Sequence, residues 1–399
     1  MLDPRAMRRC ASAIVPFLLA GALACNDTSA DANSLVGPVR ITAVRSMRGP
    51  GSATCAASPT AVVTSEMALT AATAASGPGD VIAIDGTIVL THEIEVRTGS
   101  VTLTCLQPGD GLAMSAAASP DVSALLDIYA RNVTVQGLSL DARNTGYAIV
   151  AQSIPGGTDR RGVRIIGNDI WCGSAVCVFV IGRGALILKN TLTSASDAPS
   201  TSGFHLQGGP DSARVEGNHV RALTPQGTSR FGGIRAVGGR DVVLRDNVIT
   251  GPWSNGLALT YLQGGVVEGN GVSGAQLNGI YVAYGSNHTV SVRGVLVRGN
   301  ISSAEGAGLY VDGACGNVFV ANRLSTTGAS PVAAFAQNTG ANALLGELRG
   351  GVVDNGNVDC DGDGSVDPNM VSGTKRRDTT PPGEVIGSVM RNYRGIVIE

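Results

Sequence analysis

The chain has 399 residues, of which 43% are hydrophobic, 4% are aromatic and 55 are glycine, and its formal net charge is −2. A core of small aliphatic side chains punctuated by glycine favours short strands and tight turns over large helices. Nucleic-acid-binding surfaces are usually strongly basic, so this charge balance predicts no nucleic-acid partner.

The first 24 residues have the layout of a secretory signal peptide, with arginines before an apolar run over residues 10–24. The ending ALAC (22–25) resembles a bacterial lipobox, in which cleavage precedes the cysteine and its thiol carries lipid. This resemblance implies a lipidated Cys25 and membrane attachment only through that anchor; ordinary cleavage near Ala24 is the alternative. Asn26 is not the aspartate that marks inner-membrane retention. We therefore expect an exported bacterial protein, either an outer-membrane or cell-surface lipoprotein or otherwise a periplasmic or secreted one.

Composition divides the rest of the chain into three segments. Residues 25–60 are rich in Ser, Ala, Gly and Thr and are predicted to form a flexible tether. Residues 61–350 hold the strand-like repeats described below, and residues 351–399 hold an acidic loop, a linker and a tail. None of these segments has an apolar run long enough to span a bilayer.

Cysteine usage agrees with export. Six cysteines lie beyond residue 25, and an even number in an exported chain predicts disulfides. Cys172 and Cys177 are close enough in sequence to staple one loop. The order along the chain suggests the other two pairs, Cys55–Cys105 and Cys315–Cys360.

A short helix is predicted near the start of the folded segment, in TSEMALTAATAASGPGD (64–80). Thr64 or Ser65 can cap its amino terminus, and Glu66 suits its first turn. The Gly-Pro-Gly run at 77–79 ends it.

One phrase recurs along the middle of the chain: apolar residues flank an asparagine, as in IIGNDI (165–170) and LRDNVI (244–249). A second phrase, glycine followed by alternating apolar residues, comes between the copies, as in GFHLQG (203–208) and GIYVAY (279–284). Its period of two is typical of a strand. The asparagines, 22 to 30 residues apart, are Asn168, Asn190, Asn218, Asn247, Asn270, Asn300 and Asn322.

Such a repeat predicts a solenoid, because each unit is too small to bury its own apolar face and must stack on its neighbours. Parallel strands of successive coils would lie about 4.8 Å apart. The asparagines would form a ladder in which each amide donates to one neighbour and accepts from another, at a turn whose left-handed backbone asparagine tolerates. Gly-Asn turns of an antiparallel barrel are the alternative, but they would not recur with apolar residues on both sides.

The two phrases together resemble the right-handed parallel β-helix repeat of the pectin-lyase-like superfamily, over residues 130–350 and more loosely 80–350. The resemblance implies an all-β fold, a single-stranded right-handed parallel β-helix with three strands per coil and a short amino-terminal capping helix. It places the asparagine ladder between the second and third strands and makes the glycine phrase the first strand. In the family's polysaccharide enzymes, the outer face of that first strand lines a groove that binds sugar chains.

Strand parity assigns the side chains on this outer face. If the residue after each glycine points inward, the next residue points outward, and so does the residue two positions later. The first outward column is then His205, Arg235, Ala258, Tyr281 and Tyr310, and the second is Gln207, Val237, Thr260, Ala283 and Asp312.

These columns form the candidate site. Tyrosine offers a flat face and a hydroxyl to a sugar, and Arg235 can pair with a uronate carboxylate. A histidine or a tyrosine can act as base or acid in β-elimination. An outward side chain that is simply solvated is the alternative for each. The candidate substrate-binding residues are Gln207, Arg235, Thr260, Tyr281 and Tyr310, and the candidate catalytic residues are His205, Arg235, Tyr281, Tyr310 and Asp312.

The columns depart from the family's enzymes. Inverting hydrolysis needs two carboxylates around a water, but the paired aspartates of polygalacturonases are missing and only Asp312 is present. The calcium cluster and catalytic arginine of typical pectate lyases are not matched, and no helix follows the glycine-rich pieces, so we expect no organic cofactor. The leading hypothesis is a protein that binds acidic polysaccharide; whether it also cleaves or epimerises the polymer, as a lyase or epimerase, is left open. A non-catalytic structural or adhesive surface module is the alternative.

A last motif lies in NVDCDGDGSVDPN (357–369). It places Asp359, Asp361, Asp363 and Asp367 at loop positions 1, 3, 5 and 9, a spacing at which oxygen ligands can wrap calcium. The motif resembles the calcium loops of dockerin and thrombospondin type-3 repeats, so calcium is the expected metal. Position 12 is a methionine where EF-hands place a bidentate glutamate, and an acidic, solvated turn is the alternative.

Overall fold

The computed structural model describes residues 54–373, apart from 153–161, 173, 195–201, 225–231, 284–291, 337, 347 and 349. These residues belong to one compact unit, residues 41–385, and the other unit, residues 1–40 with 386–399, lies outside them. The predicted signal peptide, Cys25 and most of the tether therefore lie outside the described residues. The described part of the chain contains no helix that is long and apolar enough to cross a membrane.

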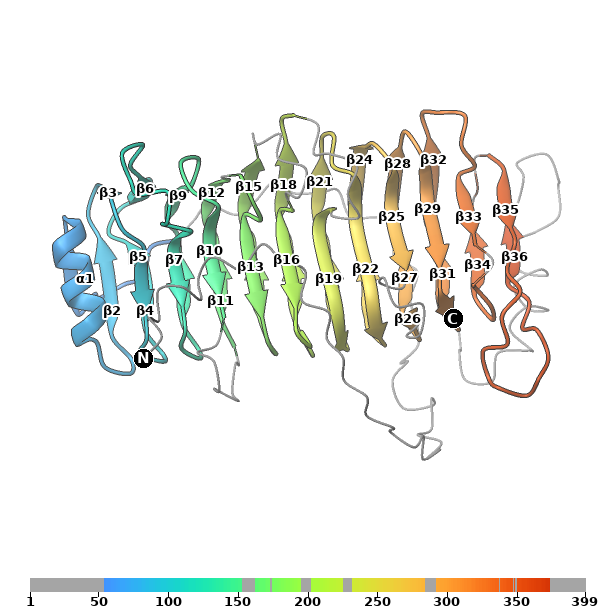
Figure 1. The fold of residues 1–399 in the computed structure, drawn as a ribbon, viewed down its shortest axis with the longest axis horizontal. Coiled ribbons are helices and arrows are strands. Elements are labelled where there is room, and N and C mark those ends of the chain that lie inside the picture. Colours follow the sequence, from blue (N-terminus) through green and yellow to red (C-terminus); the bar gives the residue numbers. More distant parts are fainter. Residues whose placement is uncertain are drawn as a thin grey trace, which may run out of the picture. The chain divides into compact units, whose positions relative to one another are not determined.

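The described strands wind into about 11 coils of a parallel β-helix, which confirms the fold class predicted from the repeats (Figure 1). A typical coil contributes one strand to each of three parallel sheets. We number the sheets by their order within a coil. Sheet 1 contains the glycine phrase, sheet 2 precedes the ladder asparagine, and sheet 3 follows it.

The three sheets have the following strands. Sheet 1 contains β4 (Ile94–Val96), β7 (Ala124–Ile128), β10 (Tyr147–Ala151), β13 (Val178–Ile181), β16 (Phe204–Gln207), β19 (Gly232–Arg240), β22 (Asn255–Gln263), β25 (Asn278–Ala283), β29 (Ala307–Asp312), β33 (Ala333–Phe335) and β35 (Val352–Asp354); in addition, β26 (Val292–Arg293) pairs with β22, and β30 (Ala314–Cys315) pairs with β26. Sheet 2 contains β1 (Ala61–Val63), β2 (Val81–Ile84), β5 (Thr102–Cys105), β8 (Thr134–Gln136), β11 (Arg164–Ile166), β14 (Leu186–Leu188), β17 (Arg214–Glu216), β20 (Val243–Arg245), β23 (Val266–Glu268), β27 (Leu296–Arg298), β31 (Val318–Val320), β34 (Ala343–Gly346) and β36 (Met370–Gly373). Sheet 3 contains β3 (Thr87–Leu90), β6 (Gly111–Met114), β9 (Ser139–Asp141), β12 (Asp169–Cys172), β15 (Thr191–Ser194), β18 (His219–Ala222), β21 (Val248–Thr250), β24 (Gly271–Ala275), β28 (Ile301–Ala304) and β32 (Arg323–Thr326).

The helix predicted before the first coil is α1 (Glu66–Ala75), which packs against β1 to β4 (Figure 1). Ser65 caps it, because the Ser65 hydroxyl accepts a hydrogen bond at 3.3 Å from a backbone N–H of the first turn. The Glu66 carboxylate accepts from the backbone N–H groups of Thr91 and His92 at 2.9 and 2.8 Å. These bonds tie α1 to the first coil.

Aliphatic side chains fill the interior of each coil. In sheet 2 the middle residue of each short strand points inward, and Ile165, Ile187, Val215 and Leu244 are each 0% exposed. Each of these side chains stacks on its register partner in the next coil. Burying apolar surface in this way stabilises the fold by roughly 25 cal/mol per Å².

The seven asparagines of the repeat are buried in one ladder between sheets 2 and 3. Asn247 is typical: its side-chain amide donates to Asn270 Oδ1 at 2.9 Å and to the Val215 carbonyl at 2.8 Å. We expected the left-handed backbone at the asparagine itself. Instead, the residue before the asparagine adopts it, for example Asp246 with φ 53°. Glycine adopts this conformation without strain, which explains why Gly-Asn recurs in the phrase.

The three disulfides join Cys55 to Cys105, Cys172 to Cys177 and Cys315 to Cys360, as the order along the chain suggested. Disulfides form and persist in oxidising compartments. The three bridges therefore indicate an exported protein.

The β-helix continues past residue 350, where we expected it to end, because β35 and β36 extend sheets 1 and 2. A second, shorter ladder accompanies this extension, between sheets 1 and 2. The amide of Asn317 donates to Asn342 Oδ1 and that of Asn342 donates to Asn369 Oδ1, both at 2.9 Å. Each of these asparagines directly precedes a strand of sheet 2, whereas the asparagines of the repeat phrase follow one.

Candidate functional site

The first outward column predicted from parity is a continuous row on the outer face of sheet 1. Along this row, His205 pairs with Arg235, Arg235 with Ala258, Ala258 with Tyr281, and Tyr281 with Tyr310, each on the neighbouring strand. In the second column, Thr260 pairs with Ala283 and Ala283 with Asp312, while Gln207 pairs with Ile181.

Three members of this row are covered, which corrects the expectation of an open groove along it. His205 is 5% exposed, Ala258 is 0% exposed and Tyr281 is 9% exposed. Thr260, which we expected on an exposed face, is also buried. Parity assigns the direction of a side chain but not what lies over it, so the candidates that solvent reaches are the half-buried or exposed ones, Gln207, Arg235, Tyr310 and Asp312.

Burial changes the chemistry of His205. Desolvation, and then the charge of Arg235, lowers the His205 pKa to about 3, so the ring is neutral at neutral pH. Desolvation also lowers the Arg235 pKa to about 10, which leaves the guanidinium charged. At neutral pH the pair is therefore a neutral ring, which is a weak base, beside a cation, and His205 cannot serve as the acid.

Aromatic rings lie along the same row. The rings of Tyr281 and Tyr310 stack with centroids 5.8 Å apart and planes 10° from parallel. On the other side of the row, Phe179 meets His205 edge-on at 5.1 Å and lies 6.3 Å from Tyr147. The sequence reading missed Phe179, because its strand does not begin with the glycine phrase.

A pocket opens at the carboxyl-terminal end of the row. Tyr310, Asp312, Phe335, Asn338 and Asn355 line it, together with two alanines. The Asn338 amide donates to Asp312 Oδ1 at 3.4 Å. The pocket therefore combines an aromatic side with hydrogen-bonding groups, and it includes two of the predicted residues.

The amino-terminal end of the row is acidic. Glu95 on β4 and Asp127 on β7 are register partners, so the structure supplies neighbouring carboxylates that the sequence reading missed. Tyr129 donates to Asp127 Oδ2 at 2.6 Å, and Arg97 forms an ion pair with Glu95 at 2.7 Å. A small pocket nearby is lined by Tyr129 and Gln152.

Burial and the neighbouring charges raise the pKa values of several groups at this acidic end. Desolvation raises the pKa of Asp127, although Tyr129 and Gln152 donate to it and oppose the shift. Glu93 also has a raised pKa, first through desolvation and then through the charge of Asp127. Desolvation and the bond to Asp127 raise the pKa of Tyr129 to about 12.

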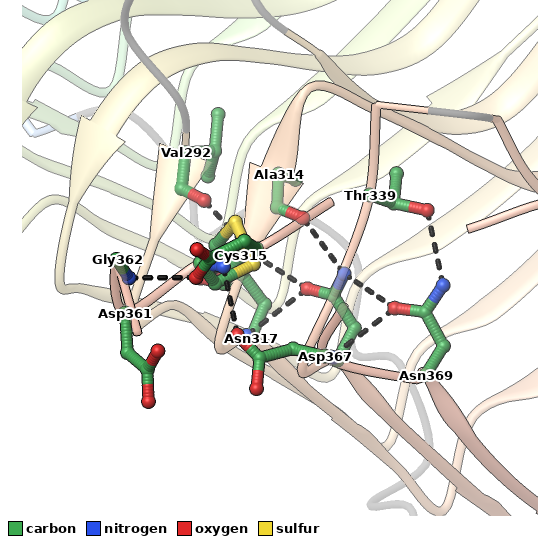
Figure 2. Close-up of a disulfide and its surroundings, with 12 residues drawn as sticks. Val292, Ala314, Cys315, Asn317, Thr339, Asp361, Gly362, Asp367 and Asn369 are labelled. Carbon is green, nitrogen blue, oxygen red and sulfur yellow. Dashed lines mark hydrogen bonds between the residues drawn. A yellow bond between two sulfur atoms is a disulfide. The ribbon is translucent and has the colours of Figure 1, made fainter. Parts of the chain in front are cut away.

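Three of the four aspartates predicted to bind calcium converge. Ligand oxygens of Asp359, Asp361 and Asp363 lie within 4.8 Å of one another. Asp367 is not in this group; its carboxylate accepts instead from the Cys360 backbone N–H at 2.7 Å. Figure 2 shows the Cys315–Cys360 disulfide between this loop and the second asparagine ladder. Calcium binding stays a prediction.

The coil geometry defines this chain as a right-handed parallel β-helix protein, and residues 156–340 match the family model described as a right handed beta helix region. No curated protein is significantly similar to the chain in sequence.

Several solved structures are similar in coil arrangement. The Dettilon tailspike protein is 13% identical, with a TM-score of 0.43 over 77% of this chain and 64% of its own. A pectate lyase is 13% identical, with a TM-score of 0.41 over 76% of this chain and 79% of its own. The A-module of a mannuronan C-5 epimerase from Azotobacter vinelandii is 14% identical, with a TM-score of 0.42 over 78% and 91%. This chain spans 64% of the Dettilon tailspike chain, which is less than two thirds of its length. The low sequence identities and TM-scores identify no substrate for this chain.

Proposed function

We propose that the protein is an exported polysaccharide-binding protein whose ligand lies across the coils on the outer face of sheet 1. The observation that carries this proposal is the stacked pair of Tyr281 and Tyr310, which continues into the pocket containing Asp312 and Asn338. Aromatic faces pack against the apolar faces of sugar rings, and carboxylate and amide groups hydrogen-bond their hydroxyls. Tyr281, on the neighbouring strand, packs against the Tyr310 ring, while Tyr310 stays partly open to a ligand.

Arg235 adds a reason to expect a ligand with carboxylates. The guanidinium stays charged at neutral pH and is half-buried, so an ion pair with a uronate there would be screened less than on an open surface. Gln207, which is exposed in the second column, offers further hydrogen bonds to sugar hydroxyls.

Elimination or epimerisation is the second candidate, and one observation favours it. Arg235 can pair with the carboxylate next to the carbon that loses the proton, and its register partner His205 lies beside it. A ring whose pKa is about 3 is, however, a weak base at neutral pH. Because the His205 side chain is only 5% exposed, a substrate could reach it only after the residues that cover it had moved. Binding without turnover, in an adhesive or structural surface protein, therefore fits the geometry better.

Affinity electrophoresis tests the proposal. Wild type, Tyr310→Ala and the control Trp171→Ala would be run through gels containing neutral, uronate and mixed polysaccharides. Trp171 is a half-buried aromatic residue on the outer face of sheet 3. We expect retardation of wild type and of Trp171→Ala, and loss of it in Tyr310→Ala; equal migration in every gel contradicts binding. Ultraviolet absorbance of unsaturated products would reveal elimination.

We also propose that lipid attached to Cys25 holds the protein at a membrane. The lipobox-like ALAC sequence supports this proposal. Mass spectrometry of the mature amino terminus tests it, with a diacylated Cys25 as the expected result and cleavage at another residue as the contradicting one.

A further inference from the structure

Charge is distributed unevenly along the outer face of sheet 1. At the amino-terminal end, Glu93, Glu95 and Asp127 gather around β4 and β7, and Arg97 pairs with one of these three carboxylates. At the carboxyl-terminal end, Asp312 lines the pocket beside Tyr310. Both ends of the face are therefore negative.

Between these ends, the described outward columns contain one cation. Arg235 lies near the centre, and its row neighbours are a neutral histidine and an alanine. The positions that follow on the carboxyl-terminal side are Tyr281 and Tyr310, which are uncharged aromatic residues. A ligand that follows the row meets one site that attracts an anion, with uncharged surface next to it.

This charge distribution disfavours the binding of a polymer that has a carboxylate on every sugar. Such a chain would place anions opposite Asp312 and opposite the carboxylates around Asp127. Each like-charge contact at about 4 Å weakens binding by about fivefold at low ionic strength. Desolvation raises the pKa of Glu93, and the charge of Asp127 raises it further, before any ligand arrives.

We infer that the site takes an acidic heteropolysaccharide in which neutral sugars separate the uronates, and that it discriminates against homopolymers of uronate. One carboxylate pairs with Arg235, and neutral sugars lie over Tyr310 and fill the Asp312 pocket. This inference rests on the proposed binding function and narrows the class of polymer expected from the sequence.

The test compares three probes: gellan, in which neutral sugars separate the uronates; polygalacturonate, in which every sugar is a uronate; and neutral hydroxyethylcellulose. We expect wild type to bind gellan at least about tenfold more tightly than polygalacturonate at low salt, since about two like-charge contacts are avoided. Equal or tighter binding of polygalacturonate overturns the inference but leaves polysaccharide binding intact. Failure to bind any of the three probes overturns the proposed function as well.

Charge variants test the cause. Glu93→Gln with Asp127→Asn should raise the affinity for polygalacturonate about fivefold or more and change gellan binding little. Arg235→Gln should weaken gellan binding and leave the weaker binding of hydroxyethylcellulose unchanged. Glu216→Gln is the matched control, because Glu216 pairs with Arg214 on sheet 2. Unchanged polygalacturonate affinity in the double variant, with circular dichroism like that of wild type, contradicts the inference.

Discussion

His205 and Arg235 are register partners on neighbouring strands, and both lie on the outer face of sheet 1 rather than inside the coil. Burial nevertheless lowers the pKa of each. Together they form a neutral ring beside a cation, a pair that can bind a carboxylate but whose ring neither supplies nor readily accepts a proton at neutral pH.

His205 should make the stability of the protein depend on pH with a defined sign. Its pKa is about 3 in the folded protein and 6.5 when unperturbed, so the unfolded chain binds an extra proton between these values. The unfolding free energy that depends on a neutral His205 ring is fully present above pH 6.5 and is lost as the pH falls toward 3. Between pH 7 and pH 5, wild type should lose about 1–2 kcal/mol more unfolding free energy than His205→Gln, measured by urea denaturation.

The control for this experiment is Gln207→Asn, since Gln207 is exposed on the same strand as His205 and does not ionise. It should show the same pH dependence as wild type. If wild type and His205→Gln also show the same dependence, His205 is not kept neutral by folding.

Asp127→Asn should stabilise the protein more at pH 7 than at pH 4. Because the folded pKa of Asp127 is raised, the folded state holds the proton more strongly, and stability is lost as the pH rises through that folded pKa. Asparagine does not ionise, so the variant does not lose this stability as the pH rises. Urea midpoints measure the effect, and the pKa of Glu93, followed by NMR, should fall when the Asp127 charge is removed.

Asp141→Asn is a control of opposite sign. The Arg143 guanidinium lowers the pKa of Asp141, so removing this carboxylate should destabilise the protein at pH 7. Equal responses of the two variants to pH would mean that burial of Asp127 does not govern its ionisation.

Asn247→Ala should cost about 2–4 kcal/mol of unfolding free energy. Alanine leaves the Val215 carbonyl and the Asn218 amide groups without their buried partner. Chemical denaturation measures the loss. Ser273→Ala, at an exposed position of sheet 3, should change stability by less than about 0.5 kcal/mol. A comparably small loss for Asn247→Ala would show that the ladder contributes little to stability.

Calcium binding by the acidic loop should depend on Asp359, Asp361 and Asp363 more than on Asp367. In calorimetric titrations with calcium chloride, Asp361→Asn should weaken binding at least about tenfold, because one of the converging carboxylates is lost. Asp367→Asn removes the acceptor for the Cys360 N–H, so it should destabilise the loop rather than remove a ligand. Absence of binding heat in wild type refutes the calcium prediction.

The coil interior and the strand register could be predicted from the sequence for a physical reason. Because side chains alternate with a period of two, a slip of one residue would turn inward residues such as Ile234 out to solvent. The recurring asparagine marks the same turn in every coil. The register of His205, Arg235 and Tyr281 followed from these two constraints.

Exposure and the acidic end of the face could not be predicted in the same way. Whether other residues cover Ala258 and Thr260 depends on how the whole chain packs. A period-two sequence pattern does not contain this information. Glu95 and Asp127 lie in strands without the glycine phrase, so only the observed register brings them together. The carboxylates therefore remained outside the sequence-derived columns.

Hydroxyl-radical footprinting with mass spectrometry, with and without gellan, is the most direct test that sheet 1 presents the ligand surface. Tyr310 is half-buried at the pocket, and Trp171 is half-buried on the outer face of sheet 3, so the two aromatic residues report on different faces. We predict that gellan protects Tyr310 from labelling and leaves Trp171 unchanged. Protection of Trp171 with full labelling of Tyr310 would contradict this account.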